Sequence, residues 1–291
     1  FSMMFSSCRI LRRVPSYNTS GGTDFSYMFQ VCYALTELPF LDTSSGTNFT
    51  YMLYFVPITS VPKWNFSAGT NFLAMFNGCA ALREVPDMNL PAGTTYYQMF
   101  TACYGLVKVG NLTVNTTVGV DFGSMFQNCS NLSEFGSMNT IGGTSFADMF
   151  AGCTSLGVAP TLNLTNATAF TAMARMFQNC YIIRSVSGLT MGSGGAANMF
   201  DGCFSLQSFT NSFTQTASNT SMFNNCFSLS TFTLPLTLGN SLVGTRLTKA
   251  SLESVFDLLV STSAATLVVT GSAGADTPVV LGGFTATSGS T

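Results

Sequence analysis

The nine cysteines are the side chains of this 291-residue chain with the widest chemical range, because thiolates form disulfides, bind soft metals and carry redox chemistry. They lie at Cys8, Cys32, Cys79, Cys103, Cys129, Cys153, Cys180, Cys203 and Cys226. Their number is odd, and no pair has the spacing of a C-x-x-C motif. The intervals between them cluster near 24 residues apart from one double gap, which indicates a repeat. We therefore interpret the cysteines as one structural column of reduced thiols packed in a core.

Other residue types that carry catalysis are missing or scattered. The chain has no histidine, the commonest general base and metal ligand. Its acids Asp121, Asp148 and Asp201 fall at different positions of the repeat, unlike the paired carboxylates of a glycosidase. The sequence therefore predicts no enzyme and no catalytic, cofactor-binding or metal-binding residue. With 8% charged residues and a formal net charge of −2, we expect no nucleic-acid binding, and no apolar run reaches the roughly 18 residues needed for membrane insertion.

A methionine, usually followed by phenylalanine, marks each of ten copies of the repeat. The copies are centred on Met4, Met28, Met52, Met75, Met99, Met125, Met149, Met176, Met199 and Met222. The spacing runs from 23 to 27 residues, and the pattern reads F-x-x-M-F-x-x-C-x-x-L-x-x-V-P, then a short alternating stretch, then G-T. The third copy lacks the cysteine and is one residue shorter before Pro62.

Each copy predicts one short helix and one strand. Phe25, Met28, Phe29 and Cys32 share one helical face at i, i+3, i+4 and i+7. Four threonines that follow a glycine are expected to cap these helices: Thr23, Thr47, Thr70 and Thr94. Alternating apolar residues predict strands over 88–90, 112–114, 162–164 and 189–191. A unit of about 24 residues cannot bury its apolar stripe alone, so we predict an α/β repeat solenoid with a parallel sheet on one side.

Two sets of side chains are candidates for the outer, ligand-binding face. The residues nine positions after the methionines carry charges that alternate between neighbouring copies: Arg13, Glu37, Glu84, Lys108 and Glu134. This column indicates either register control between strands or a charged binding stripe. Aromatic side chains that could stack on sugar rings are Tyr17, Tyr97 and Tyr104, whereas Trp64 falls on the apolar phase of its strand and is expected in the core.

The array divides the chain into two segments. Residues 1–240 form the solenoid, whose first repeat we expect to be truncated. Residues 241–291 form a C-terminal cap and the start of a linker or further module. In the cap, Thr248 precedes an amphipathic helix that includes Leu252, Val255 and Phe256. The stretches at 266–270 and 278–281, separated by a Gly-rich turn, predict a short hairpin or paired edge strands. Such atypical units cover the last apolar face of a repeat array.

The repeat pattern resembles the leucine-rich repeat of BspA-like surface proteins, a bacterial surface-protein repeat, over Phe1 to Leu236. The resemblance implies a right-handed, leucine-rich-repeat-like coil of ten turns, each with a short helix and a strand, closed by a helix-and-strand cap. Members are surface proteins of bacteria and some parasitic protists that are associated with adhesion, and similar arrays occur in bacteriophage tail fibres. The segment from Leu247 to Gly271 is similar to segments that follow such arrays in phage fibre-like proteins. The family offers no catalytic motif.

These observations favour a non-enzymatic, extracellular recognition module. The leading hypothesis is a bacteriophage tail fibre or other virion-surface protein that binds a host surface glycan or protein. The alternatives are a structural decoration, spacer or filament subunit whose partners are neighbouring subunits, and a bacterial cell-surface adhesin. The expected location is the virion surface or the cell surface, and we expect a homo-oligomer or part of a larger assembly.

Overall fold

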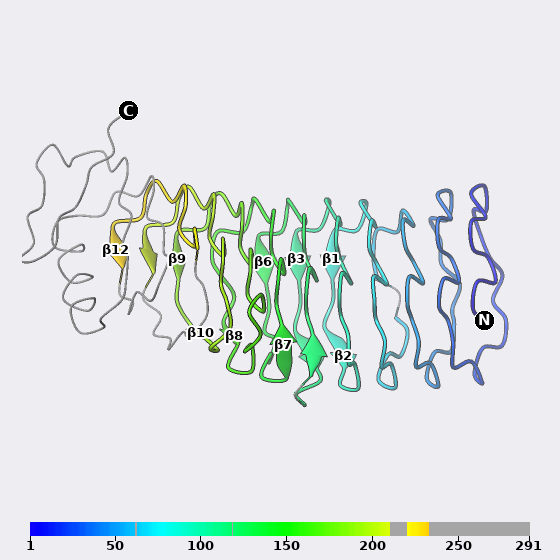
Figure 1. Ribbon diagram of the computed structural model, residues 1–291. Helices are drawn as coiled ribbons and strands as arrows, with labels where there is room; N and C mark the ends of the chain where they lie inside the picture. Colours follow the sequence, from blue (N-terminus) through cyan, green and yellow to red (C-terminus); the bar gives the residue numbers. More distant parts are fainter. Residues whose placement is uncertain (62, 118, 210–219, 233–291) are drawn as a thin grey trace, which may run out of the picture.

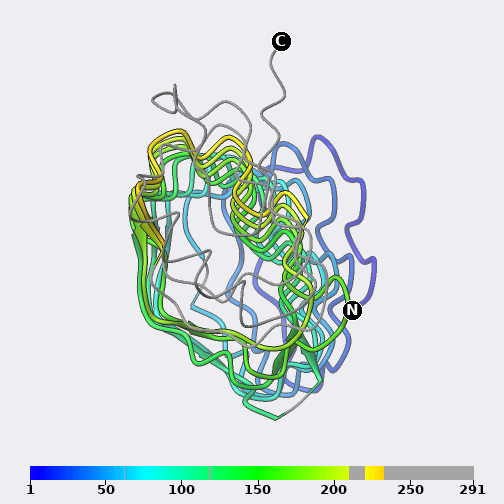
Figure 2. The ribbon, with the colours of Figure 1, turned by 60° about the vertical axis from the view of Figure 1, so that its left-hand side comes forward.

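The computed structural model describes residues 1–61, 63–117, 119–209 and 220–232. These residues form a parallel β-solenoid, in which the chain winds around one core and successive copies of the repeat stack side by side (Figure 1). Figure 2 looks more nearly along the stack, and the copies lie over one another around a common interior. The predicted cap, with its helix and strands in 241–291, lies outside the described residues.

The strands of the solenoid are short and pair in parallel between successive copies. They are β1 (Glu84–Val85), β2 (Met88–Leu90), β3 (Lys108–Val109), β4 (Leu112–Val114), β5 (Val120–Asp121), β6 (Glu134–Phe135), β7 (Gly143–Ser145), β8 (Leu162–Asn163), β9 (Ser185–Val186), β10 (Leu189–Thr190), β11 (Ser208–Phe209) and β12 (Thr231–Phe232). The sheets have the orders β1-β3-β6, β12-β11-β9, β2-β4, β10-β8 and β5-β7. The strands predicted at 88–90 and 112–114 are confirmed, and those near 162 and 189 are one residue shorter than predicted.

The predicted helix of each copy is wrong, because the described residues contain none. In the second copy the N–H groups of Met28 and Cys32 donate to carbonyls three residues earlier, at 3.3 and 3.2 Å, while the N–H of Phe29 donates 2.9 Å to Met52 O in the next copy. Tyr27 and Val31 have positive φ angles of 58° and 60°. A left-handed residue every fourth position interrupts the i→i−4 hydrogen bonds of an α-helix. The segment is therefore a run of β-turns that forms backbone hydrogen bonds with the same segment of the neighbouring copies. We call the stacked segments the turn ladder.

The turn ladder continues along the whole described array. From Phe5 to Phe200, the residue after each motif methionine donates its N–H to the methionine carbonyl of the next copy, at 2.8–2.9 Å. The threonines predicted as helix caps also bond between copies, so that expectation is wrong as well. Thr47, Thr70 and Thr94 each donate a hydroxyl hydrogen bond to the threonine carbonyl of the preceding copy, at 3.2, 3.1 and 3.0 Å.

The core consists of columns of like side chains. Phe126 is fully buried, and its ring stacks between those of Phe100 and Phe150 with centroid distances of 5.4 and 5.5 Å. The motif methionines from Met28 onward are likewise fully buried. The high content of Phe and Met therefore reflects a few core positions repeated from copy to copy. The described part of the chain contains no helix long and apolar enough to cross a membrane.

Candidate functional site

The cysteine column lies inside the solenoid, with one exception. All nine thiols are free, and all except Cys8 are buried. Each buried Sγ lies within hydrogen-bonding distance of a backbone carbonyl of the preceding copy, as in Cys129 to Phe100 O at 3.1 Å. Burial raises the pKa of Cys79, Cys129 and Cys180 to about 12, so these thiols are neutral at physiological pH and are poor nucleophiles or metal ligands. Cys8, in the first of the ten copies, is exposed.

The charged column places opposite charges next to each other. Parallel pairing of β1, β3 and β6 sets Lys108 between Glu84 and Glu134, and its Nζ lies 3.9 Å from one carboxylate oxygen of each. Arg13 and Glu37 form a 2.9 Å ion pair. Because these side chains are largely exposed, each pair contributes about 0–1 kcal/mol, so the column affects register more than stability.

That column is not a continuous charged stripe. Ser60 occupies the place between Glu37 and Glu84, and further along Val158 pairs with Ser185. Neighbouring charges within the column also neutralise one another. A charged ligand would therefore meet, in this column, only isolated charged side chains that are already paired with a neighbour.

The tyrosines proposed for ligand binding lie in three different environments. Tyr97 and Tyr104 are exposed, on separate columns of the surface. Tyr17 falls on the inward phase of its segment, against the rings of Phe1 and Phe5, and burial raises its pKa to about 12. Trp64 is 8% exposed, and its indole N–H donates to Pro39 O at 3.3 Å.

Tyr97 lies near a cluster of aromatic side chains on the turn ladder, close enough to Tyr51 to affect its pKa, and we call the whole set the tyrosine patch: Tyr27, Tyr51, Tyr54, Phe55 and Tyr97. Ring centroids lie 5.3 Å apart for Tyr27 and Tyr51, 5.1 Å for Tyr51 and Tyr54, and 4.5 Å for Tyr54 and Phe55. Burial, and then the neighbouring hydroxyls of Tyr27, Tyr54 and Tyr97, raise the pKa of Tyr51. The patch thus combines flat apolar surface with hydroxyl groups that can form hydrogen bonds.

Two glycines make room for the rings of the tyrosine patch. A Cβ atom at Gly78 would lie 2.7 Å from the Phe55 ring, and one at Gly123 would lie 3.0 Å from the Tyr97 ring. Gly78 also has a positive φ of 77°, which other residues rarely adopt. Sequence reasoning found only Tyr97 of this patch. The other aromatic residues occupy variable positions of the motif, where the residue type is not repeated throughout the array and so gives no pattern to recognise.

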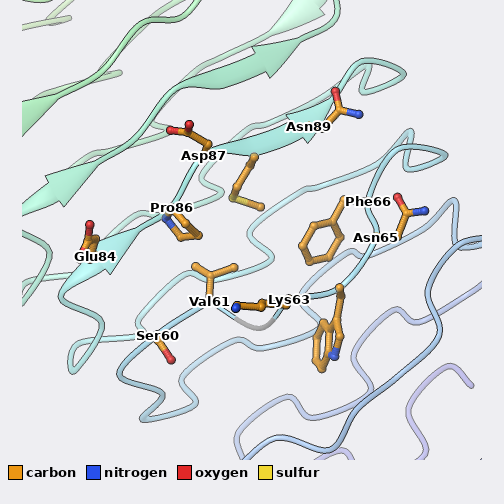
Figure 3. A pocket seen from close by; sticks show the side chains of 11 residues that line it. Ser60, Val61, Lys63, Asn65, Phe66, Glu84, Pro86, Asp87 and Asn89 are labelled. Carbon is orange, nitrogen blue, oxygen red and sulfur yellow. The ribbon is translucent and has the colours of Figure 1, made fainter.

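A groove opens in the wall between the third and fourth copies (Figure 3). Its volume is about 780 Å³, within the range of roughly 300–1,000 Å³ typical of ligand pockets. One wall contains Ser60, Val61, Lys63, Trp64, Asn65 and Phe66, and the other contains Glu84, Pro86, Asp87, Met88 and Asn89. Sequence reasoning missed this groove, although the shorter third copy was a signal that its neighbours would not match it residue by residue.

The groove is closed at both ends by hydrogen bonds between the copies. At one end Arg83 N–H donates to Thr59 O at 3.4 Å, and at the other Thr94 N–H donates to Thr70 O at 2.8 Å. Among the described residues between these points, no hydrogen bond joins 61–69 to 85–93. The groove is therefore a local opening in an otherwise bonded wall.

No potential metal site accompanies these features, because the described residues contain no group of three or more Cys, Asp or Glu side chains placed to hold an ion. Of the acids that sequence reasoning weighed for catalysis, Asp121 accepts the backbone N–H of Gly123 at 2.8 Å, and the other two bond to neighbouring side chains. Asp148 forms a two-pronged hydrogen-bonded pair with Arg175, with both N–O distances at 2.8 Å. Asp201 accepts hydrogen bonds from the side-chain amides of Gln178, Asn224 and Asn225 at 3.0–3.1 Å.

Comparison with known proteins gives one family match and distant structural neighbours. A family model described as "Mycoplasma protein of unknown function, DUF285" matches residues 1–111, 94–187 and 120–233. No curated protein matches the chain. A leucine rich cell surface protein from Faecalibacterium prausnitzii A2-165 is 18% identical with a TM-score of 0.41; the match covers 87% of this chain and 65% of that one, so this chain spans less than two thirds of its neighbour. A leucine-rich repeat protein from Bacteroides ovatus ATCC 8483 is 13% identical with a TM-score of 0.26, over 92% of this chain and 80% of that one.

Proposed function

The chain belongs to the DUF285 family, and from that premise we propose that it is a surface-displayed recognition module, which binds a protein or glycan through the outside of its solenoid. The observation that carries the proposal is the tyrosine patch. Phe55 and Tyr97 are 41% and 37% exposed, although a chain with so many core positions has ample interior for aromatic rings. Tyrosine supplies large, rigid contact area at low entropic cost, and aromatic residues are enriched in binding interfaces.

We place this module on the cell surface as an adhesin, the alternative that the repeat pattern also favoured. The description of the matching family names Mycoplasma, a bacterium. No observation on the described residues supports the predicted tail-fibre setting. The proposal includes a coil of ten right-handed turns with a C-terminal cap. The stacking of the copies is supported by the hydrogen bond that recurs from the residue after each motif methionine, from Phe5 to Phe200, to the methionine carbonyl of the next copy.

The role is non-enzymatic in this proposal. The thiols of the column other than Cys8 are buried, and the acids Asp148 and Asp201 are held by hydrogen bonds to neighbouring side chains. The uncharged hydroxyls and amides on the surface suit recognition by hydrogen bonds and apolar contact, which needs no reactive group.

Binding of the full chain to intact host cells and to a glycan array tests the proposal. The double variant Tyr51→Ser/Tyr97→Ser should lose roughly tenfold or more in affinity, since truncated aromatic residues at the centre of an interface commonly cost that much. Tyr104→Ser is the matched control, because Tyr104 is 52% exposed but lies outside the patch. No binding by the unmodified chain to cells or glycans, or equal losses in the two variants, would overturn the proposed role of the patch.

A second candidate is the predicted structural role, as a subunit or spacer that contacts its own assembly. It is favoured by three exposed rings that stack along the coil: Tyr181 on Phe204 at 4.9 Å and Phe204 on Phe227 at 5.4 Å, all at least 40% exposed. Sedimentation of the full chain distinguishes the candidates. A structural subunit should self-associate at micromolar concentration and dissociate on Phe204→Ser, whereas a recognition module alone should sediment identically before and after that change.

A further inference from the structure

Strand β2 has one edge free at the groove. Its other edge pairs with β4, where Met88 N–H donates to Asn111 O at 3.0 Å. The main-chain groups of successive strand residues point to opposite sides, so the N–H and C=O of Asn89 point toward the third copy. No hydrogen bond joins β2 to the described residues of that copy. An open strand edge of this kind is a template for a further strand.

Along each wall of the groove, apolar side chains that face inward alternate with polar side chains that face outward, as in a β-strand. Trp64, Phe66 and Met88 line its inner side and are 5–8% exposed. The neighbours of these residues along the chain, Lys63, Asn65, Asp87 and Asn89, are exposed, and in Figure 3 Asn65, Asp87 and Asn89 lie at the outer rim. A chain lying along β2 would therefore meet apolar and polar surroundings at alternate residues.

The charges of the groove distinguish its two walls. Glu84 and Asp87 lie on the β2 side, while Lys63 lies on the wall of the third copy. Asp87 Oδ1 accepts the N–H of Asn111 at 2.6 Å, which holds this carboxylate beside β2. Because Glu84 already pairs with Lys108, a basic side chain on the outward face of a bound segment would meet Asp87, and an acidic one at the same place would be repelled.

We propose that the groove binds an extended peptide segment of a partner protein, which adds to the free edge of β2. Its inward side chains are apolar and contact Trp64, Phe66 and Met88, and one of its outward side chains is basic and pairs with Asp87. Main-chain hydrogen bonds to an exposed strand edge supply the affinity in this mode of recognition, and the pockets for alternate side chains supply the specificity. The groove is a second site beside the tyrosine patch, and either can fail without the other.

The test uses a fluorescein-labelled peptide of alternating valine and threonine with one central lysine, titrated into the full chain. Asn89→Pro removes the N–H that points into the groove and leaves the Met88 N–H bond to β4 in place. Its matched control, Asn89→Ala, keeps that N–H. We expect binding to fall tenfold or more in the proline variant and less than about twofold in the alanine variant, as fits loss of a main-chain hydrogen bond with its partner left unpaired.

Peptide variants keep the proposal falsifiable if Asn89→Pro fails to fold. N-methylation of the central peptide bonds should abolish binding to the unmodified chain, and replacing the lysine by glutamate should weaken it at least fivefold. The Tyr51→Ser/Tyr97→Ser chain should bind the peptide normally, which separates this site from the tyrosine patch. No binding of the peptide, no effect of N-methylation, or equal binding by the proline and alanine variants would overturn the proposal.

Discussion

The buried thiols predict that the protein loses stability in mildly alkaline solution. Burial raises the pKa of Cys129 from its usual value of 9.0 to about 12. Below pH 9.0 both the folded and the unfolded chain keep this proton, so the thiol adds no pH dependence. Between that pH and about 12, the unfolded chain loses the proton while the folded chain holds it. The free energy of unfolding therefore falls by about 1.4 kcal/mol per pH unit for each such thiol.

The variant Cys129→Val isolates the contribution of one thiol. The third copy already carries Val56 at the cysteine position, where it is fully buried and donates its N–H to Leu53 O at 3.1 Å, just as Cys129 donates to Phe126 O at 3.1 Å. Valine is thus compatible with this position, and its cost near neutral pH should be about 1 kcal/mol, from the lost Sγ–Phe100 hydrogen bond.

Urea unfolding of both chains at about pH 8, 9, 10 and 11, under reducing conditions, measures the two slopes. Above about pH 9 the stability of the variant should fall less steeply, by about 1.4 kcal/mol per pH unit. Lysines, tyrosines and the other thiols titrate in both chains, so their effects cancel in the difference. Parallel curves would refute the reasoning, since they would mean that the thiol of Cys129 ionises as readily in the folded chain as in the unfolded one.

Thiol labelling, core truncation and charge reversal test other parts of the structure. Iodoacetamide at about pH 8 should alkylate Cys8 rapidly and the remaining thiols only after unfolding, as mass spectrometry will show; a second label on the folded chain would contradict the burial of the column. Phe126→Ala should lower the free energy of unfolding by about 4 kcal/mol, while Phe227→Ala, at a ring that is 46% exposed, should cost less than about 1 kcal/mol in the same denaturation assay; similar costs would be inconsistent with the stacked core. Lys108→Glu should destabilise the fold by about 0.5–1 kcal/mol, and an effect unchanged in about 1 M salt would rule out an electrostatic origin.

The columns of the core could be predicted from the sequence, because each is repeated many times. Met, Phe and Cys recur at fixed spacing, and a position that recurs with one residue type must meet the same surroundings in every copy. The strand phase was equally clear, since Met88 and Leu90, and then Leu112 and Val114, alternate with polar residues and form β2 and β4. The third copy, with Met52, departs from the pattern, and so do the ninth and tenth, in which Ala196 and Asn219 replace the first phenylalanine.

The turn ladder could not be predicted, because its apolar spacing is also that of a helix. Phe25, Met28, Phe29 and Cys32 face the core both in an α-helix and in a run of β-turns with a left-handed residue every fourth position. Tyrosine and valine seldom adopt positive φ, so the local sequence at Tyr27 and Val31 gave no sign of a left-handed conformation. Hydrogen bonds to the next copy stabilise this conformation, and they exist only after stacking.

The two proposed binding sites were hidden for the opposite reason, because each depends on departures from the repeat. Tyr51, Tyr54 and Phe55 sit in the irregular third copy, and the wall that ends at Phe66 belongs to that copy too. A pattern averaged over copies removes the residues that differ, and those are the residues that give a repeat protein its specificity.

The turn ladder has a consequence for how this protein can evolve. Since the described copies bond to the copies on either side, duplication or loss of a copy beyond the sixth leaves every contact of the groove and of the tyrosine patch unchanged. Recombination between repeats would then lengthen or shorten the solenoid one copy at a time, and each step would move the sites farther from or nearer to the C-terminal end. Reach could thus vary between strains of one species while the groove and the patch stayed the same.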